Sequence, residues 1–491
     1  MLRMPRRVAR WLAACLAALA GWPTAAPAEA ASTIEVSLDA RATLYYYLEC
    51  ATGGISCSQH DVAILLGGIL GQDLAARLEF EWGGTLEKYT IEAQLRAPAS
   101  PDLPGAGPDT TETLDLRARI DDVLFAGGPA DLVRAKLGVI LGAAEVRALE
   151  AAFAAAWPIF ARWWSDHEGD WRSYAARVED LVHSDAARVV QASGRMHGQS
   201  DDTNLTVHLI AVPVAGPVNR ASQKGSRSFV EFRPGDDPVS RVAVMVHEYC
   251  HYLFETAPRE LRRARWDAFA ASPDPAAASA LAVMNEALAS AIGNGLFMKA
   301  HLDAPRFDDY ASRRESFYAN AAVDRAAKAA LPLVEQYAHS GRAMDRAFFD
   351  EYFRRSQVTF ADNPADPRVA LGVSQFYYTQ DSLERLAVGA TSRYGFTSVY
   401  FNRWSPDRYP ETMAYRFPAL PVAIIGTDAD YRPALANFLP DADLPLVGGL
   451  RAAACKARRE GGGWLYVFVV SPSQLLLDMP SRLPDCGRKL V

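Results

Sequence analysis

One stretch constrains the fold of this chain more than any other, the apolar run from Val242 to Phe254, which contains the pattern His-Glu-x-x-His. Its apolar residues recur at helical spacing, so the run predicts a helix. Residues four apart share one face of a helix, so His247 and His251 can direct both imidazoles to one metal ion. Glu248 lies about 100° further around the helix, where its carboxylate can take a proton from a water molecule on the metal. The motif therefore predicts two metal ligands and a base.

Two interpretations of this motif are open. In the simpler one, one histidine is a core residue and the other lies on the surface. The apolar flanks and the unbroken helical pattern favour the metal site, because they leave the opposite face of the helix to be buried. Zinc is the expected ion, since neutral imidazoles suit it and a catalytic zinc takes three protein ligands and keeps one position for water.

A third ligand is expected on a second helix, the alanine-rich run from 277 to 294. This run contains Glu286, whose neighbours three and four positions away are mostly small. Small side chains let two helices approach closely, as a shared metal requires. In the alternative interpretation Glu286 is merely an exposed residue, but the Asn285-Glu286 pair in an otherwise apolar helix argues against it.

At these residues the chain resembles the gluzincins, zinc metallopeptidases with His-Glu-x-x-His on one helix and an Asn-Glu pair on a helix downstream. The matching residues are His247, Glu248, His251, Asn285 and Glu286. The resemblance implies a zincin-like fold, zinc bound by the two histidines and Glu286, and Glu248 as general base in the hydrolysis of peptide bonds.

The chain departs from the motifs of two related groups of zinc peptidases, and these departures limit which branch it can resemble. The chain has neither the His-x-x-Gly-x-x-His extension nor the Met-turn of the metzincins. Ser290 stands four residues after Glu286, where the thermolysin-like branch has an aspartate. The order of an early β segment, a helical middle and the zinc helix resembles a poorly characterised bacterial branch of the clan.

Peptide hydrolysis requires two further elements. The oxyanion needs a second electrophile, and Tyr318 is the preferred candidate, on the next predicted helical segment; other downstream candidates are Tyr310, Tyr377, Tyr378, His301 and His339. An extended substrate can add to the edge of a sheet through its backbone. The candidate edge strand consists of Phe229, Val230, Glu231 and Phe232, although a structural hairpin explains this alternating run equally well.

The rest of the chain predicts an α+β protein: a mainly helical, zincin-like catalytic domain with an edge strand, a β-rich N-terminal part and a small α/β C-terminal unit. Residues 1–30 form a predicted signal peptide, with basic residues before a short apolar run and small residues near Ala28 and Ala30. Residues 31–110 are predicted to be β-rich, with a hairpin of 78–82 and 85–96 around Gly83-Gly84. Residues 111–200 are predicted helical, 201–355 form the metallopeptidase domain, and 356–491 form the C-terminal unit, with a helix at 448–459 between two buried strands.

Charge and cysteine content indicate the compartment and exclude some partners. The net charge is −7, and cleavage after Ala30 would remove four arginines and one glutamate to give −10. An acidic chain of this kind is expected to bind nucleic acids poorly. After the signal peptide, no run reaches the ~18 apolar residues that a stable membrane span needs. Disulfides are predicted between Cys50 and Cys57 and between Cys455 and Cys486, which leaves Cys250 unpaired. These features predict a periplasmic or secreted protein.

The predicted function is an exported, zinc-dependent peptidase acting on a peptide or protein. Two alternatives stay open: a zinc hydrolase of esters or other amides, and a zinc-binding protein without turnover. The intact Glu248 argues against the second, because a structural zinc site needs no base. The sequence gives no indication of the oligomeric state.

Overall fold

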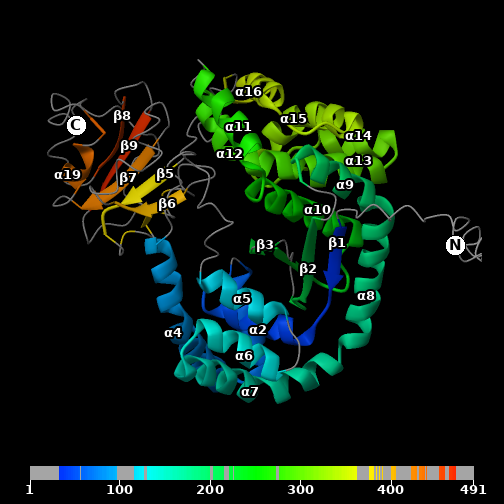
Figure 1. Ribbon diagram of the computed structural model, residues 1–491, viewed down its shortest axis with the longest axis vertical. Coiled ribbons are helices and arrows are strands. Elements are labelled where there is room, and N and C mark those ends of the chain that lie inside the picture. Colours follow the sequence, from blue (N-terminus) through cyan, green and yellow to red (C-terminus); the bar gives the residue numbers. More distant parts are fainter. Residues whose placement is uncertain are drawn as a thin grey trace, which may run out of the picture.

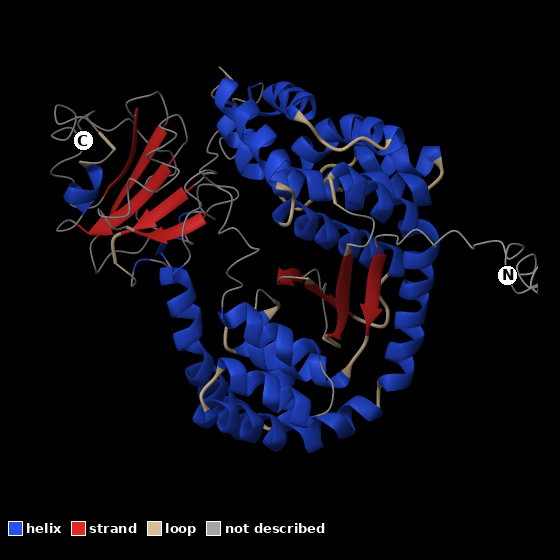
Figure 2. Cartoon of the chain, in the orientation of Figure 1, coloured by secondary structure: helices blue, strands red, loops and turns tan. Residues whose placement is uncertain are grey.

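The structure is a computed structural model that describes residues 33–96 and 116–361 apart from short gaps (56, 127–129, 200–202, 215–219, 225 and 273–275). Beyond residue 361 it describes mainly the strands of a second sheet. Figures 1 and 2 show a mixed α+β protein in which helices surround the first sheet and the second sheet lies apart. The predicted α+β class is confirmed. The predicted signal peptide lies outside the described residues.

The first sheet has four strands in the order β1-β2-β4-β3. The strands are β1 (Thr33–Ser37), β2 (Asn204–Ala211), β3 (Ala221–Lys224) and β4 (Arg227–Phe232). β1 and β4 both pair with β2 in parallel, and β3 pairs with β4 in the antiparallel direction. The buried β2 and β4 form the middle of the sheet, so β1 and β3 are its edges.

The predicted edge strand is therefore wrong. Phe229, Val230, Glu231 and Phe232 lie on β4, which is paired on both sides, and all four are fully buried. Glu231 has a structural role, because it accepts hydrogen bonds from the Tyr46 hydroxyl (2.9 Å) and from the hydroxyl of Ser58 (2.6 Å). The real edge next to β4 is β3, whose sequence Ala-Ser-Gln-Lys is too short and too polar to stand out as a strand.

The described residues between 33 and 199 are mainly helical, so the prediction of a β-rich region at 31–110 is wrong. Its helices are α2 (Ala40–Ala51), α3 (Gln59–Leu70), α4 (Gln72–Arg96), α5 (Leu116–Ala126), α6 (Ala130–Ile140), α7 (Ala143–Ser165), α8 (Glu168–Leu181), η1 (Val182–Ala186) and α9 (Ala187–Met196). Among the residues described from 33 to 199, β1 is the only strand. The helices predicted between 111 and 200 are present.

The predicted hairpin around Gly83-Gly84 is a single helix, α4. Leu78, Trp82 and Leu86 are fully buried, and their spacing of four residues places them on one face of that helix. Between Leu78 and Trp82 apolar and acidic residues also alternate, which is the pattern of a strand. The strand prediction is wrong because this alternation covers only five residues. Gly83 packs against Thr52, where an added Cβ would meet the threonine methyl at 3.2 Å. Gly83 thus serves helix packing, while Gly84 has open space around its Cα.

The site-bearing helices follow β4. They are α10 (Pro238–Glu255), α11 (Arg259–Ala271), α12 (Ala276–Ser290), which continues as the π-helix η2 (Ala291–Phe297) and α13 (Met298–His301), then α14 (Ala304–Ser312), α15 (Ala321–Ser340) and α16 (Arg346–Ala361). One hydrophobic core contains residues from Ile34 to Phe353. The N-terminal helices, the first sheet and the site-bearing helices therefore share a single interior.

The second sheet has its own core and the order β6-β5-β7-β9-β8. Its strands are β5 (Gln375–Tyr378), β6 (Tyr400–Arg403), β7 (Val422–Thr427), β8 (Ala453–Arg458) and β9 (Trp464–Val470), with a short helix α19 (Tyr431–Leu435). The helix predicted at 448–459 is wrong, since β8 runs antiparallel to β9 there. An edge strand with one paired side tolerates the alanine and charged residues that suggested a helix.

The cysteines behave largely as predicted. Cys50 and Cys57 form a disulfide, and Cys250 is a free, buried thiol. Cys455 is disulfide-bonded, and Cys486, its predicted partner, lies outside the described residues. Within the described part of the chain, no helix combines the length and apolar character needed to cross a membrane.

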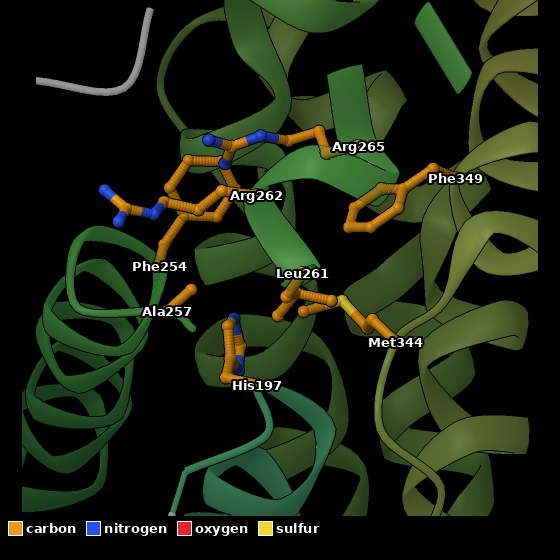
Figure 3. A pocket seen from close by; sticks show the side chains of 8 residues that line it. All are labelled: His197, Phe254, Ala257, Leu261, Arg262, Arg265, Met344 and Phe349. Carbon is orange, nitrogen blue, oxygen red and sulfur yellow. The ribbon is translucent and has the colours of Figure 1, made fainter. Parts of the chain in front are cut away.

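A small cavity lies beside the C-terminal end of α10 (Figure 3). It measures about 10 Å³ and is lined by residues that include His197, Phe254, Leu261 and Arg265. The Nδ1 atom of His197 donates to the Ser193 carbonyl oxygen (2.8 Å), while its Nε2 atom is buried without a hydrogen-bond partner. A space of this size is large enough for about one water molecule. The cavity is too small to be a substrate site.

Buried His197 gives the protein a testable pH dependence. Burial lowers the pKa of His197 to about 4, although its bond to Ser193 opposes this. The unfolded state therefore binds a proton more readily, so stability is full above pH ~6.5 and is lost as pH falls towards 4. We expect His197 to account for a loss on the order of 3 kcal/mol. Urea unfolding at pH 7 and pH 4.5 should show a smaller loss for His197→Gln than for wild type, whereas exposed His60→Gln should match wild type.

Candidate metal centre

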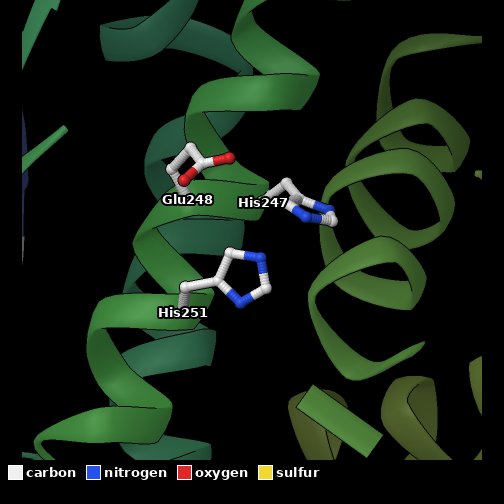
Figure 4. Close-up of side chains that lie close together, drawn as sticks. All are labelled: His247, Glu248 and His251. Atoms are coloured by element: carbon white, nitrogen blue, oxygen red, sulfur yellow. The ribbon is translucent and has the colours of Figure 1, made fainter. Parts of the chain in front are cut away.

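Helix α10 positions the His-Glu-x-x-His residues. It begins where the Asp237 side chain accepts hydrogen bonds from the amides of Val239 and Ser240 (3.2 Å each), followed by Pro238 at the first helical position. His247, Glu248 and His251 offer donor atoms that all lie within 4.8 Å of one another. Figure 4 shows both imidazoles projecting from the same side of the helix, with Glu248 beside them. The predicted helix and its clustered side chains are confirmed.

Glu286 on α12 completes the cluster. Its Oε2 atom lies 3.4 Å from Nε2 of His247, and its Oε1 atom lies 3.6 Å from Nε2 of His251. Ligands placed about 2.0–2.2 Å from a tetrahedral zinc lie about 3.3–3.6 Å from one another. In addition, Glu286 Oε2 is buried and has no hydrogen-bond partner. Both nitrogen–oxygen distances match the spacing of ligands around one metal ion, and an ion between these side chains would give the buried oxygen a partner.

Two side chains of α12 lie close to the Nδ1 atoms of the histidines. The Nδ1 atom of His251 donates to Oδ1 of Asn285 at 2.9 Å. Because an amide oxygen can only accept, Nδ1 carries a proton, so Nε2 is the nitrogen that can bind a metal once it has lost its own proton. The Ser290 hydroxyl lies 3.5 Å from Nδ1 of His247, at the place where the thermolysin-like branch has a carboxylate. The Asn-Glu pair thus supplies both a ligand candidate and the residue that orients another.

Gly293 on η2 allows the two helices to approach, and sequence reasoning missed it. A Cβ atom at this position would lie 2.6 Å from the Ala243 carbonyl oxygen and 2.8 Å from the backbone nitrogen of His247. Only a glycine fits against the backbone of α10 at the level of the first histidine. The surrounding π-helical turn is a form often found at functional sites. The sequence shows only that a glycine occurs within a predicted helix. It does not show that the backbone of α10 lies against this glycine.

Tyr318 lies beside His247, on the loop between α14 and α15 and not on the predicted helical segment. Its ring stacks on that of His247 with the centroids 6.0 Å apart and the planes at 15°. Burial, followed by the charge of Glu286 and a hydrogen bond to it, raises the pKa of Tyr318 well above its usual range. The hydroxyl therefore keeps its proton at neutral pH and can donate it in a hydrogen bond.

The other candidates for this role have structural partners elsewhere. The Tyr310 hydroxyl donates to the Ser316 carbonyl oxygen (2.7 Å), and Nδ1 of His301 lies 2.6 Å from Asp185. His339 bonds the carbonyl oxygen of Glu335, while Tyr377 and Tyr378 belong to the second sheet. Of the six candidates, Tyr318 is the one that contacts a histidine of the cluster.

The electrostatics of the cluster favour a cation. Burial opposes a charge on His251, but the hydrogen bond and the charge of Glu286 outweigh it and raise the pKa of His251 to about 9. The same pairing holds the pKa of Glu286 below its usual range, against the effect of burial. Burial raises the pKa of Glu248. The charges of His251 and His247 lower this pKa, but they offset only part of the increase. The site thus combines a carboxylate that stays charged with a second one suited to accepting and releasing a proton.

No protein-family model matches this chain, and comparisons with curated proteins and with solved structures also find no match. The described residues nevertheless contain a group that could hold a metal ion, His247, Glu248 and His251, with Glu286 facing both imidazoles. Functional inference therefore depends on the geometry of these side chains.

Proposed function

We propose that the protein is a zinc metallopeptidase of the gluzincin type, exported by its N-terminal signal peptide. The observation that carries this proposal is the pair of distances from the Glu286 carboxylate to the two imidazoles, 3.4 and 3.6 Å. Two neutral imidazoles and one carboxylate are a donor set that suits zinc and leaves a fourth position for water. When bound, zinc would polarise a peptide carbonyl and lower the pKa of its water ligand.

Glu248 is the proposed general base. Its side chain is buried next to both histidines, and its raised pKa brings it closer to neutral pH, where a base can both take and return a proton. In the proposed reaction Glu248 accepts the proton of the attacking water and passes it to the nitrogen of the leaving amine. A site that served only to hold a metal would have no need of this second carboxylate.

Tyr318 is the proposed stabiliser of the oxyanion. Its protonated hydroxyl interacts with the Glu286 carboxylate, which faces both histidines. As negative charge develops on the carbonyl oxygen of the substrate, the hydroxyl can turn from Glu286 to that oxygen and donate a hydrogen bond.

Strand β3 is the proposed substrate-binding edge, in place of the residues that the sequence suggested. It packs against α10, and its outer side is not paired within the described sheet. Gln223 on β3 hydrogen-bonds Glu255, which lies one helical turn beyond His251. An extended peptide that pairs with β3 would thus run along α10 past the metal ligands, held mainly through its backbone.

Replacing Glu286 tests the metal site directly. We expect Glu286→Ala to lower zinc in the purified protein from one ion per chain to a small fraction, because one of three protein ligands is lost. Metal analysis of the variant beside wild type, together with hydrolysis of casein and quenched peptides, provides the measurement. Exposed Glu81→Ala is a matched control that should retain full zinc and activity.

The outcomes separate the proposed activities. Full zinc content in Glu286→Ala would mean that another residue is the third ligand. A wild-type protein with one zinc that cleaves esters but no peptide would be a different zinc hydrolase. One with zinc but no hydrolysis of either substrate would be a zinc-binding protein.

A further inference from the structure

We propose that Asp324 is a positioning residue that acts through the loop 313–320 to hold Tyr318 against His247. This inference rests on the proposed function, in which the Tyr318 hydroxyl assists the reaction. Asp324 does not reach the metal cluster itself. It lies in the first turn of α15, just after the loop that carries Tyr318.

The carboxylate of Asp324 accepts hydrogen bonds from two backbone amides of the loop just before Tyr318. Its Oδ1 atom accepts from the amide of Phe317 (2.9 Å), and its Oδ2 atom accepts from the amide of Glu315 (3.2 Å). Lys328, one turn further along α15, pairs with the same Oδ2 atom at 2.9 Å. Asp324 is only 3% exposed. A buried carboxylate with two backbone donors and one cation is fully engaged, so it fixes the groups that it binds.

The loop requires such an anchor because its backbone is unfavourable in isolation. Glu315 has a φ of 58°, a left-handed conformation that a non-glycine residue adopts only when its surroundings impose it. The Asp324 bond to the Glu315 amide is one such constraint. The ammonium group of Lys328 adds another by donating to the Arg313 carbonyl oxygen at 2.5 Å.

Packing on the other side directs Tyr318 towards the metal cluster. Phe317 is buried and its ring stacks on Tyr310, with centroids 5.6 Å apart. The two neighbouring side chains pack on different groups, Phe317 on Tyr310 and Tyr318 on His247. Asp324 holds the amide of Phe317, and Tyr318 follows directly in the chain. A shift of about 1 Å at this point would be enough to remove the tyrosine from a productive position.

A purely structural role is the competing explanation, because an acidic residue in the first turn also stabilises a helix. Asp345 provides a matched control for that role. It precedes α16, accepts from the amide of Phe348 (2.9 Å) and pairs with Arg342 (2.7 Å), and none of its hydrogen bonds or ion pairs among the described residues reaches the loop 313–320. A capping defect alone should therefore look alike in Asp324 and Asp345 variants.

The test is a double-mutant cycle on the zinc-loaded full chain. We expect Tyr318→Phe to lower kcat by about 10²–10³-fold and Asp324→Ala to lower it by about 10–100-fold with little change in KM. In the Tyr318→Phe background, Asp324→Ala should cost no more than about threefold, because the tyrosine it positions is gone. Asp345→Ala should leave kcat within about threefold of its parent in both backgrounds. Equal losses from Asp324→Ala in both backgrounds would overturn the proposal.

Hydrogen exchange supplies a readout that does not depend on activity. The amides of Glu315 and Phe317 should exchange at least about tenfold faster in Asp324→Ala, and Asp324→Asn, which retains an acceptor and the side-chain volume, provides the same comparison if the alanine variant fails to fold. Unchanged protection in both variants would overturn the proposal even if the enzyme is active. Faster exchange in a protein that proves to have no hydrolytic activity would support the anchoring of the loop while refuting the proposed function.

Discussion

Replacement of Glu248 by glutamine is expected to lower kcat/KM for peptide hydrolysis by about 10²–10⁴-fold while the zinc content stays at one ion per chain. Glutamine has nearly the same shape as glutamate, so the buried position on α10 should tolerate it. The amide cannot accept the proton of the attacking water, and it cannot return a proton to the leaving amine. Zinc analysis and cleavage of a quenched peptide on the same preparation measure both quantities.

Glu255→Gln is the matched control for this experiment. Glu255 lies two turns beyond Glu248 on the same helix, and burial raises the pKa of its carboxyl as well. Its bond to Gln223 of the proposed substrate-binding edge can affect KM, but it has no proposed part in the proton transfer, so the substitution should change kcat by no more than about threefold. Turnover in Glu248→Gln at the level of this control would remove Glu248 from the mechanism.

Gly293→Ala is expected to destabilise the protein and to weaken its metal site. A Cβ at Gly293 would overlap the Ala243 carbonyl oxygen and the His247 backbone, and neither is a flexible side-chain end that can move aside. Helices α10 and η2 must separate, at a cost of about 1–3 kcal/mol. Because the ligands sit on both helices, their separation should also lower zinc affinity. Thermal unfolding and zinc titration with a chelating indicator provide the two readouts.

Gly138→Ala on α6 is the control for the intrinsic effect of the same substitution. Gly138 is exposed on its helix, and an added Cβ would meet nothing within 4 Å. There the exchange should stabilise the protein by about 0.5–1 kcal/mol, since alanine favours the helix. If Gly293→Ala behaved in the same way, the close approach of the two helices would have no bearing on stability.

The sequence revealed the candidate metal centre because its residues lie within short segments of the chain. His247, Glu248 and His251 lie within two turns of one amphipathic helix, so their common location follows from helical spacing. Glu286 could be found because a carboxylate in an alanine-rich helix is unusual. These inferences needed only the chemistry of short segments, and the structure brings the four side chains together as expected.

The features that the sequence did not reveal depend on distant neighbours. Gly293 matters because of the backbone that crosses it, which no local pattern records. Strand β3 is at the edge of the sheet because β4 lies between it and β2. The wrong hairpin prediction at residues 78–96 has a related cause. A short alternating run is compatible with the two-residue period of a strand and with the 3.6-residue period of a helix. Only the burial of Leu78, Trp82 and Leu86 in the structure distinguishes the two.

The pairing of β1 with β2 has a consequence for the order of folding. Thr33 bonds Asn204 across a sequence separation of 171 residues, and most of the N-terminal helices lie between them. Closing so long a loop costs far more entropy than forming any one of those helices, so contacts of this kind form slowly. The helices can form as the chain emerges, but the sheet against which α10 packs is completed only after the chain has been made past β2. We expect the pairing of β1 with β2, which joins segments far apart in the sequence, to be among the slower steps of folding.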